Sequence, residues 1–176
     1  MQNLELKAAY DNLDRAFEIA EAIGAKRQWT KQQIDTYFIV PSGKLKLRKV
    51  PEQPAELIAY QRPDERSAKL SNYYIYRSLD GASLEHVLSR ALAVDLDVKK
   101  ERTLYLWENV RLHFDRVQEL GNFIEFEAVL KNSELKESRE GLGFLQSQFE
   151  IQNEQLITVG YYELLKKQKK SSASST

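Results

Sequence analysis

Charged and apolar side chains alternate at every second position in several segments of this chain, and this alternation constrains its fold more than any other feature. In one segment Arg111, His113 and Asp115 alternate with Leu112 and Phe114. Successive side chains of a β-strand point to opposite faces of a sheet. The segment is therefore predicted to be a strand with one charged face and one apolar face.

The same alternation recurs at 3–8, 44–48 and 123–127. For a single strand the simplest interpretation is a half-buried sheet whose charged face meets water. The alternative is a closed sheet that turns this face inward while amphipathic helices cover the apolar face. Charges of both signs on the same face favour the second interpretation. The charged positions are Lys7, Lys46, Arg48, Arg62, Lys100, Arg102 and Arg111 against Glu5, Asp35, Asp115, Glu125 and Glu127.

Periodicity and turn residues predict eight strands and four helices. The strands are expected at about 2–9, 28–40, 44–50, 55–62, 69–77, 97–107, 109–117 and 122–130. The helices are expected at about 12–23, 83–93, 133–149 and 161–167, the second with Val87 on its buried side. Short turns between consecutive strands favour antiparallel pairing, and a sheet of eight strands tends to curl or close. We therefore expect an α+β fold, an eight-stranded antiparallel closed β-barrel with amphipathic helices covering the outside.

Composition narrows the class of protein. The chain has 176 residues, with 26 basic and 26 acidic residues and no cysteine. This length suits one domain, expected at 1–168, followed by a disordered polar tail at 169–176. Zero net charge and the lack of a long apolar run predict a cytoplasmic protein with no nucleic-acid or membrane partner. Both a monomer and a homodimer are compatible with the sequence.

An inward charged face restricts what the protein can bind. Charges of both signs are costly to enclose unless they are paired or hold ligands. A phosphate chain together with divalent cations would satisfy the basic and the acidic side chains at once. The alternation therefore predicts a polyphosphate ligand and metal ions.

Several segments resemble the CYTH family, the triphosphate tunnel metalloenzymes, and in particular its branch similar to class IV adenylate cyclases. They include NLELK at 3–7, GKLKLR at 43–48 and the segments 33–38, 56–62, 100–102 and 111–127. The resemblance covers about residues 2–165 and keeps the order of the motifs. It implies an eight-stranded β-barrel forming a tunnel, a small-molecule triphosphate substrate, and Mg²⁺ or Mn²⁺ as cofactor.

The resemblance also implies residue roles. Phosphate-binding positions are Lys7, Lys46, Arg48, Arg62, Lys100, Arg102 and Arg111, and metal-binding positions are Glu5, Asp115, Glu125 and Glu127. The residues expected to take part in catalysis are Lys7, Arg48, Arg62 and Asp115. Asn3 departs from the family pattern, which has Glu at that position, so one metal site is expected to be weakened or rebuilt.

Three functions are compatible with these residues. The preferred one is metal-dependent hydrolysis of a nucleoside, organic or inorganic triphosphate. The second is a class IV type of adenylate cyclase that converts ATP to cyclic AMP and pyrophosphate, and the third is a non-catalytic module that binds polyphosphate. His113 is interpreted as a hydrogen-bonded structural residue, with proton carrier or metal ligand as the alternative. Tyr60 and the tryptophans are interpreted as packing residues, with stacking on a ligand ring as the alternative.

Overall fold

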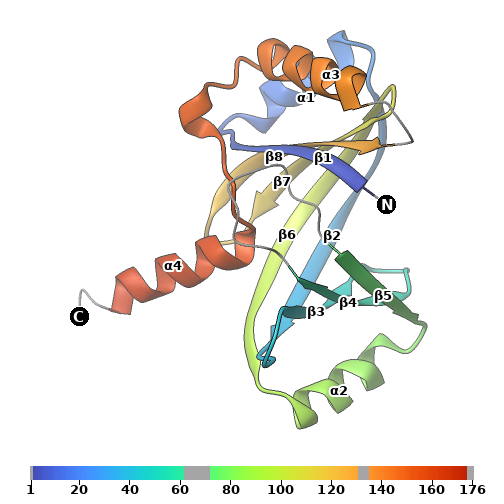
Figure 1. Cartoon of the computed structure of the whole chain (residues 1–176), viewed down its shortest axis with the longest axis vertical. Coiled ribbons are helices and arrows are strands. Elements are labelled where there is room, and N and C mark those ends of the chain that lie inside the picture. Colours follow the sequence, from blue (N-terminus) through green and yellow to red (C-terminus); the bar gives the residue numbers. More distant parts are fainter. Residues whose placement is uncertain (1, 62–71, 131–134, 174–176) are drawn as a thin grey trace.

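The computed structural model describes residues 2–61, 72–130 and 135–173, and in these residues it has eight strands, four α-helices and one short 3₁₀ helix (Figure 1). The strands are β1 (Gln2–Ala9), β2 (Lys26–Phe38), β3 (Lys44–Lys49), β4 (Ala55–Gln61), β5 (Asn72–Ser78), β6 (Val94–Trp107), β7 (Val110–Val117) and β8 (Gly121–Leu130). The helices are α1 (Leu13–Ala22), α2 (Gly81–Ala91), α3 (Leu135–Gln148) and α4 (Tyr161–Ala173), and η1 (Asn153–Gln155) is the 3₁₀ helix. The predicted α+β class and the antiparallel strands are confirmed.

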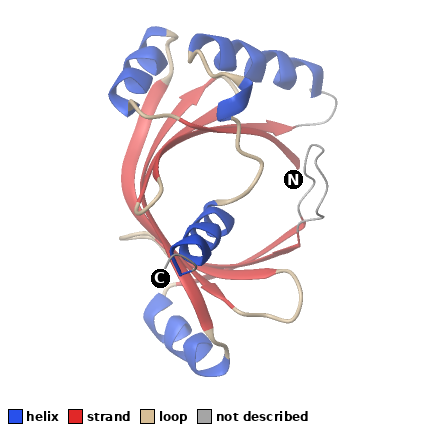
Figure 2. Cartoon of the chain, turned by 90° about the vertical axis from the view of Figure 1, so that its left-hand side faces the viewer, coloured by secondary structure: helices blue, strands red, loops and turns tan. Residues whose placement is uncertain are grey.

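All eight strands form one sheet in the order β1-β8-β7-β6-β2-β3-β4-β5, and every neighbouring pair is antiparallel. Figure 2 shows that the sheet is strongly curved. Within the described residues no ladder joins the two edge strands, β1 and β5. The eight-stranded antiparallel sheet is therefore confirmed. Its closure into a barrel is not seen among the described residues, where the sheet is curved and keeps two edges.

The main apolar face of the sheet is its convex outer face, and α1, α2 and α3 cover it as predicted. The prediction is wrong for α4, which packs against Tyr37 and Val98 on the concave side. The larger core cluster packs Tyr105, Phe114 and Phe126 of the sheet against α1 and α3. The N-cap of α1 is Asn12, whose side chain accepts a hydrogen bond from the backbone N–H of Arg15 at 3.0 Å. This cap satisfies a backbone donor at the start of the helix.

Helix α2 covers the opposite end of the sheet with a narrower apolar stripe than the sequence predicted. Leu84, Leu88 and Leu92 pack against the outer side of β3 and β4. The prediction that Val87 is buried is wrong, because 62% of its surface is exposed. The three leucines follow one another at intervals of four residues, so they form one row along the helix. Val87 lies outside this row.

The C-terminal part of the chain returns from α3 to the concave side of the sheet. Leu156 forms an isolated bridge with Ala8, and α4 begins shortly afterwards. Helix α4 continues to Ala173, beyond its predicted end near residue 167, so the expected polar tail is helical up to that residue. The hydroxyls of Ser171 and Ser172 donate back to carbonyls of the preceding turn, which is compatible with this extension. No helix in the described part of the chain is long and apolar enough to span a membrane.

The start of α2 lies so close to β4 that only glycine fits there. A Cβ atom added at Gly81 would lie 2.7 Å from the Cβ atom of Ala55. We expect Gly81→Ala to lower the free energy of unfolding by about 1–3 kcal/mol, because the helix must move away from the strand. Chemical denaturation measures this change.

Gly143→Ala is the matched control, because Gly143 lies in α3 and an added Cβ atom would meet nothing within 4 Å. This substitution should raise the free energy of unfolding by about 0.5–1 kcal/mol, the usual gain of alanine over glycine in a helix. Equal stability of the Gly81→Ala variant and the parent would contradict the packing of α2 on β4.

Candidate functional site

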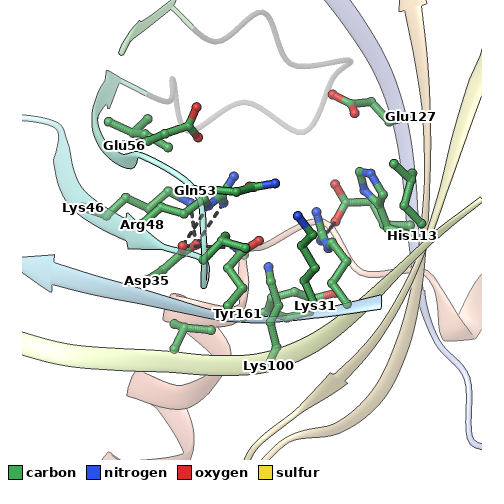
Figure 3. A pocket seen from close by; sticks show the side chains of 18 of the residues that line it. Lys31, Asp35, Lys46, Arg48, Gln53, Glu56, Lys100, His113, Glu127 and Tyr161 are labelled. Carbon is green, nitrogen blue, oxygen red and sulfur yellow. Dashed lines mark hydrogen bonds and ion pairs between the residues drawn. The ribbon is translucent and has the colours of Figure 1, made fainter. Parts of the chain in front are cut away.

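The concave face of the sheet surrounds a cavity of about 760 Å³. All eight strands contribute residues to its lining, and Gly160 and Tyr161 add the start of α4. Figure 3 shows side chains from several strands directed into this space. The cationic lining residues are Lys7, Lys31, Lys46, Arg48, Arg77, Lys100, Arg102 and Arg111, and the carboxylates are Glu5, Asp35, Glu56, Glu125 and Glu127. The predicted inward orientation of the charged face is confirmed.

The structure brings the sequence-predicted site residues together, with two exceptions. The residues that line the cavity are Lys7, Lys46, Arg48, Lys100, Arg102, Arg111, Glu5, Glu125 and Glu127. The predicted catalytic and phosphate-binding residue Arg62 lies outside the described residues. Asp115 has no exposed surface and lies beneath the lining.

Asp35 on β2 fixes two cations of β3 at one wall of the cavity. Arg48 donates from Nε and Nη2 to the two carboxylate oxygens of Asp35, at 2.9 and 3.0 Å. Lys46 Nζ donates to Asp35 Oδ2 at 2.8 Å. Burial alone would raise the pKa of Asp35, but the charges of Lys46 and Arg48 outweigh burial and hold this pKa well below its usual range. Asp35 therefore stays ionised and holds both cations in place.

Asp115 on β7 holds Arg102 of β6 in place in the same way. Arg102 donates from Nε and Nη2 to the two oxygens of Asp115, both at 2.6 Å, and the Tyr161 hydroxyl donates to Oδ2 at 2.7 Å. Burial opposes ionisation, yet the charges of Arg102 and Lys100 lower the pKa of Asp115 to about 2. Both carboxylate oxygens of Asp115 already accept hydrogen bonds, so the geometry favours a role in positioning Arg102. The metal-binding and catalytic roles of Asp115 stay predictions.

Two lysines of the cavity have pKa values near neutral pH. Burial lowers the pKa of Lys46 to about 8 and that of Lys100 to about 7. These pKa values already include the effect of neighbouring arginines, which act in the same direction as burial, and of the carboxylates Asp35 and Asp115, which act against it. A bound anion would supply the missing counter-charge, so it would favour the protonated form of both side chains.

The remaining carboxylates gather where β1 meets β8. Glu5 and Glu127 are directly opposite each other in the register of these strands, and Arg111 Nη1 donates to Glu127 at 3.2 Å. Glu125 lies 3.5 Å from Lys7 Nζ. Burial would raise the pKa of Glu125, but Lys7 and Arg102 hold it well below its usual range. Two like charges directly opposite in a sheet destabilise it unless a cation neutralises them.

These carboxylates fit a magnesium site only in part. Within the described residues there is no group of three or more acidic or histidine side chains close enough to hold a metal ion. Mg²⁺ is often bound by one or two carboxylates and completed by phosphate oxygens and water. Glu5 and Glu127 provide such a pair of hard oxygen ligands. The donor set therefore suits a divalent ion that a phosphate ligand helps to bind.

His113 lies at the cavity wall, with only 8% of its surface exposed. Burial lowers its pKa to about 3, with Arg102 adding to the effect, so the imidazole is neutral at physiological pH. Its Nδ1 atom has no hydrogen-bond partner within the described residues. The structure therefore does not bear out a hydrogen bond at this atom, and a charged proton carrier at neutral pH is disfavoured.

Sequence reasoning did not assign two parts of this site. Lys31 lies on β2 in the same alternating phase as Asp35, which was assigned to the charged face, so the period of two could have placed Lys31 in the cavity as well. Tyr161 comes from a helix that enters the concave side. No local pattern predicts this docking, because it depends on the path of the chain after α3.

The fold has close counterparts among solved structures. A protein of Pyrococcus horikoshii OT3 superimposes with a TM-score of 0.81 at 24% identity, covering 93% of this chain and 99% of the other. A putative adenylate cyclase of Vibrio parahaemolyticus gives a TM-score of 0.75 at 20% identity, covering 94% of this chain and 98% of the other. A putative adenylyl cyclase of Hippeastrum, described as having a dominant triphosphatase activity, gives a TM-score of 0.71 at 11% identity, covering 94% of each chain. At these identities the likeness shows the fold alone.

No curated protein matches this chain significantly. The model of the CYTH domain family, in contrast, matches residues 1–161, which include every described strand and the first residue of α4. The match confirms the resemblance that the charged segments indicated. This chain belongs to the CYTH domain family.

Proposed function

We propose that this chain binds a triphosphate in the cavity and hydrolyses it with the help of Mg²⁺ or Mn²⁺. The observation that carries the proposal is the charge of the lining. Its described residues include eight cationic side chains and five carboxylates. With all lysines protonated this is an excess of three positive charges, or two when Asp115 beneath the lining is counted. The whole chain has a net charge of zero. The positive charge is therefore concentrated in an enclosed space that suits a small polyanion better than a nucleic acid.

The positions of the cations match a chain of phosphates. Lys46 and Arg48 approach from β3, Lys100 and Arg102 from β6, and Lys7 from β1. An arginine can bind two phosphate oxygens at once, whereas a lysine acts as a point charge. The curvature of the sheet places these strands around the same space (Figure 2), which supports the proposed closure into a tunnel. Cations on several sides would neutralise successive phosphates of one ligand.

Phosphoryl transfer depends mainly on orientation and on neutralising charge. Arg48, Lys100 and Arg102 would hold the phosphates and stabilise negative charge on the transferring and leaving groups. Asp35 and Asp115 would keep these cations in fixed positions through the hydrogen bonds described above. Glu5 and Glu127 would hold the divalent ion, which neutralises phosphate charge when bound.

Adenylate cyclisation is a second candidate function. The cavity of about 760 Å³ lies within the range of roughly 300–1,000 Å³ that small-molecule sites occupy, so it leaves room for more than a bare phosphate chain. The Vibrio parahaemolyticus and Hippeastrum proteins with this fold are described as putative cyclases, and the latter as a dominant triphosphatase. Hydrolysis needs no recognition of a base, so it remains the first candidate.

A substrate panel separates the candidates. Tripolyphosphate, ATP, GTP and thiamine triphosphate are incubated with the full chain and Mg²⁺ or Mn²⁺, and orthophosphate, pyrophosphate and cyclic AMP are measured separately. Hydrolysis predicts orthophosphate that disappears in EDTA. Cyclic AMP and pyrophosphate from ATP would instead establish the cyclase. Binding of tripolyphosphate without any product would leave a binding module and contradict both enzymatic functions.

Two substitutions test the proposed roles of the cavity residues. Arg48→Ala removes a phosphate contact, and Glu127→Gln removes a negatively charged metal ligand, so each should reduce turnover by at least about 100-fold. The control is Arg15→Ala, because Arg15 lies on the exposed surface of α1 and pairs only with a helical neighbour among its described ion pairs. Circular dichroism and thermal unfolding check the fold. Rates close to the parent in both site variants would contradict the proposal.

Binding should depend on pH because two lysines titrate near neutrality. Lys46, with a pKa of about 8, and Lys100, with a pKa of about 7, are protonated below these values and lose their charge above them. The affinity for tripolyphosphate in EDTA should therefore fall as the pH rises from 7 to 9. Titration calorimetry measures this change.

The matched variant is Lys46→Arg, whose guanidinium stays charged over this range. Its affinity relative to the parent should increase as the pH passes 8. Ionisation of the ligand is the same for both proteins, so it cancels in the ratio. A ratio that stays constant between pH 7 and 9 would show that Lys46 does not titrate there.

A further inference from the structure

Tyr161 is the side chain through which a helix enters the cavity lining. It is the first residue of α4 and is nearly buried. Its ring contacts two lysines from different strands: Lys7 Nζ lies 4.9 Å and Lys100 Nζ lies 5.0 Å from the ring centroid. Its hydroxyl donates to Asp115 (Figure 3 labels Tyr161 beside Lys100). One aromatic side chain therefore contacts two cations and the anchor of a third.

The chain holds Tyr161 in this place by contacts on both sides of it. Before Tyr161, the backbone N–H of Ile157 donates to the carbonyl oxygen of Lys7 at 2.8 Å. After it, Glu163 pairs with Lys44 of β3, and Lys166 Nζ donates to Asp95 of β6 at 2.6 Å. The position of the ring is thus set by β1, β3 and β6 together and does not depend on the two lysines alone.

Each lysine shares a carboxylate with Arg102: Lys7 lies 3.5 Å from Glu125, and Lys100 lies 4.0 Å from Asp115. Both ammonium groups are nearly buried, and Arg102 lies close to them. The face of an aromatic ring attracts cations, by about 0.5–1 kcal/mol when exposed and about 2 kcal/mol or more when desolvated. The Tyr161 ring can therefore stabilise both charges without neutralising them, which leaves the charges available to a bound anion.

We propose that Tyr161 is a positioning residue for phosphate binding: its ring face holds the ammonium groups of Lys7 and Lys100 toward the cavity. Helix α4 thereby completes a binding wall that the sheet alone does not provide. This inference rests on the proposed function, because it concerns the phosphate affinity of these lysines. It adds a requirement on the C-terminal helix that phosphate binding by the strands does not include.

The first test compares Tyr161→Leu with Tyr161→Phe in the full chain. Affinity for inorganic tripolyphosphate is measured in EDTA by titration calorimetry, so that binding is observed without turnover. Tyr161→Leu removes the ring and should weaken binding on the order of tenfold. Tyr161→Phe keeps the ring and should stay within about threefold of the parent. Binding by Tyr161→Leu at the strength of the parent would overturn the inference.

A second series separates ring electrostatics from packing, and it remains decisive if Tyr161→Leu does not fold. Phenylalanine and its mono-, tri- and pentafluorinated analogues are placed at position 161. Fluorination withdraws charge from the ring face while keeping the shape of the ring close to constant. The affinity for tripolyphosphate should fall stepwise with the number of fluorine atoms. A flat series would assign Tyr161 a packing role only and overturn the inference.

Tyr105→Phe is the matched control, because Tyr105 is also a buried tyrosine whose hydroxyl donates to a carboxylate, here Glu21 at 3.1 Å. Tyr105 lies in the outer core, so removal of its hydroxyl should leave the affinity for tripolyphosphate unchanged. The two hypotheses fail in different ways. If the parent protein binds no tripolyphosphate, the proposed function is contradicted. If the parent binds and the fluorinated series is flat, only the role of Tyr161 is contradicted.

Discussion

The structure depends on holding cations inside a curved sheet, and two buried carboxylates make this arrangement stable. Asp35 lies directly opposite Arg48 in the register of β2 and β3, and Asp115 lies directly opposite Arg102 in that of β6 and β7. An unpaired buried charge costs several kcal/mol, whereas a bidentate pair with further hydrogen bonds offsets that cost. A slip of one residue in either register would turn these side chains to the outer face. The pairs therefore fix the register and the cavity at once.

The same alternation separates stability from ligand binding. The larger hydrophobic cluster lies outside the sheet, where Phe114 and Phe126 pack against α1 and α3. A smaller cluster lies on the inner side, where Tyr37 and Val98 of the cavity lining pack with Tyr161 of α4. The polar cavity lies inside, between the strands. Odd and even positions of one strand thus serve different purposes. Substitutions on the outer face act mainly on the free energy of unfolding. Substitutions of the cavity's lysines and arginines act mainly on the charge that a ligand meets.

The sequence predicted the parts of this structure that local periodicity determines. A period of two assigns each residue to a face, so Lys7, Lys100 and Glu127 were correctly placed together before the fold was known. Periodicity predicts which face of the sheet a side chain lies on but not how deeply it is buried. Asp115 was therefore expected to contact a ligand, whereas the structure buries it beneath Arg102. The contribution of Tyr161 depends on where the chain returns after α3, and no neighbouring residue encodes that path. Closure of the sheet is likewise a long-range property that alternation within single strands does not determine.

The most direct test of the central claim is a crystal structure of this chain with tripolyphosphate and Mn²⁺, using the anomalous signal of manganese to place the metal. The account predicts phosphate density in the cavity, in contact with Arg48, Lys100 and Arg102. It also predicts a manganese peak between the phosphates and the carboxylates of Glu5 and Glu127. Phosphate bound outside the cavity, or an empty cavity at saturating ligand, would contradict it.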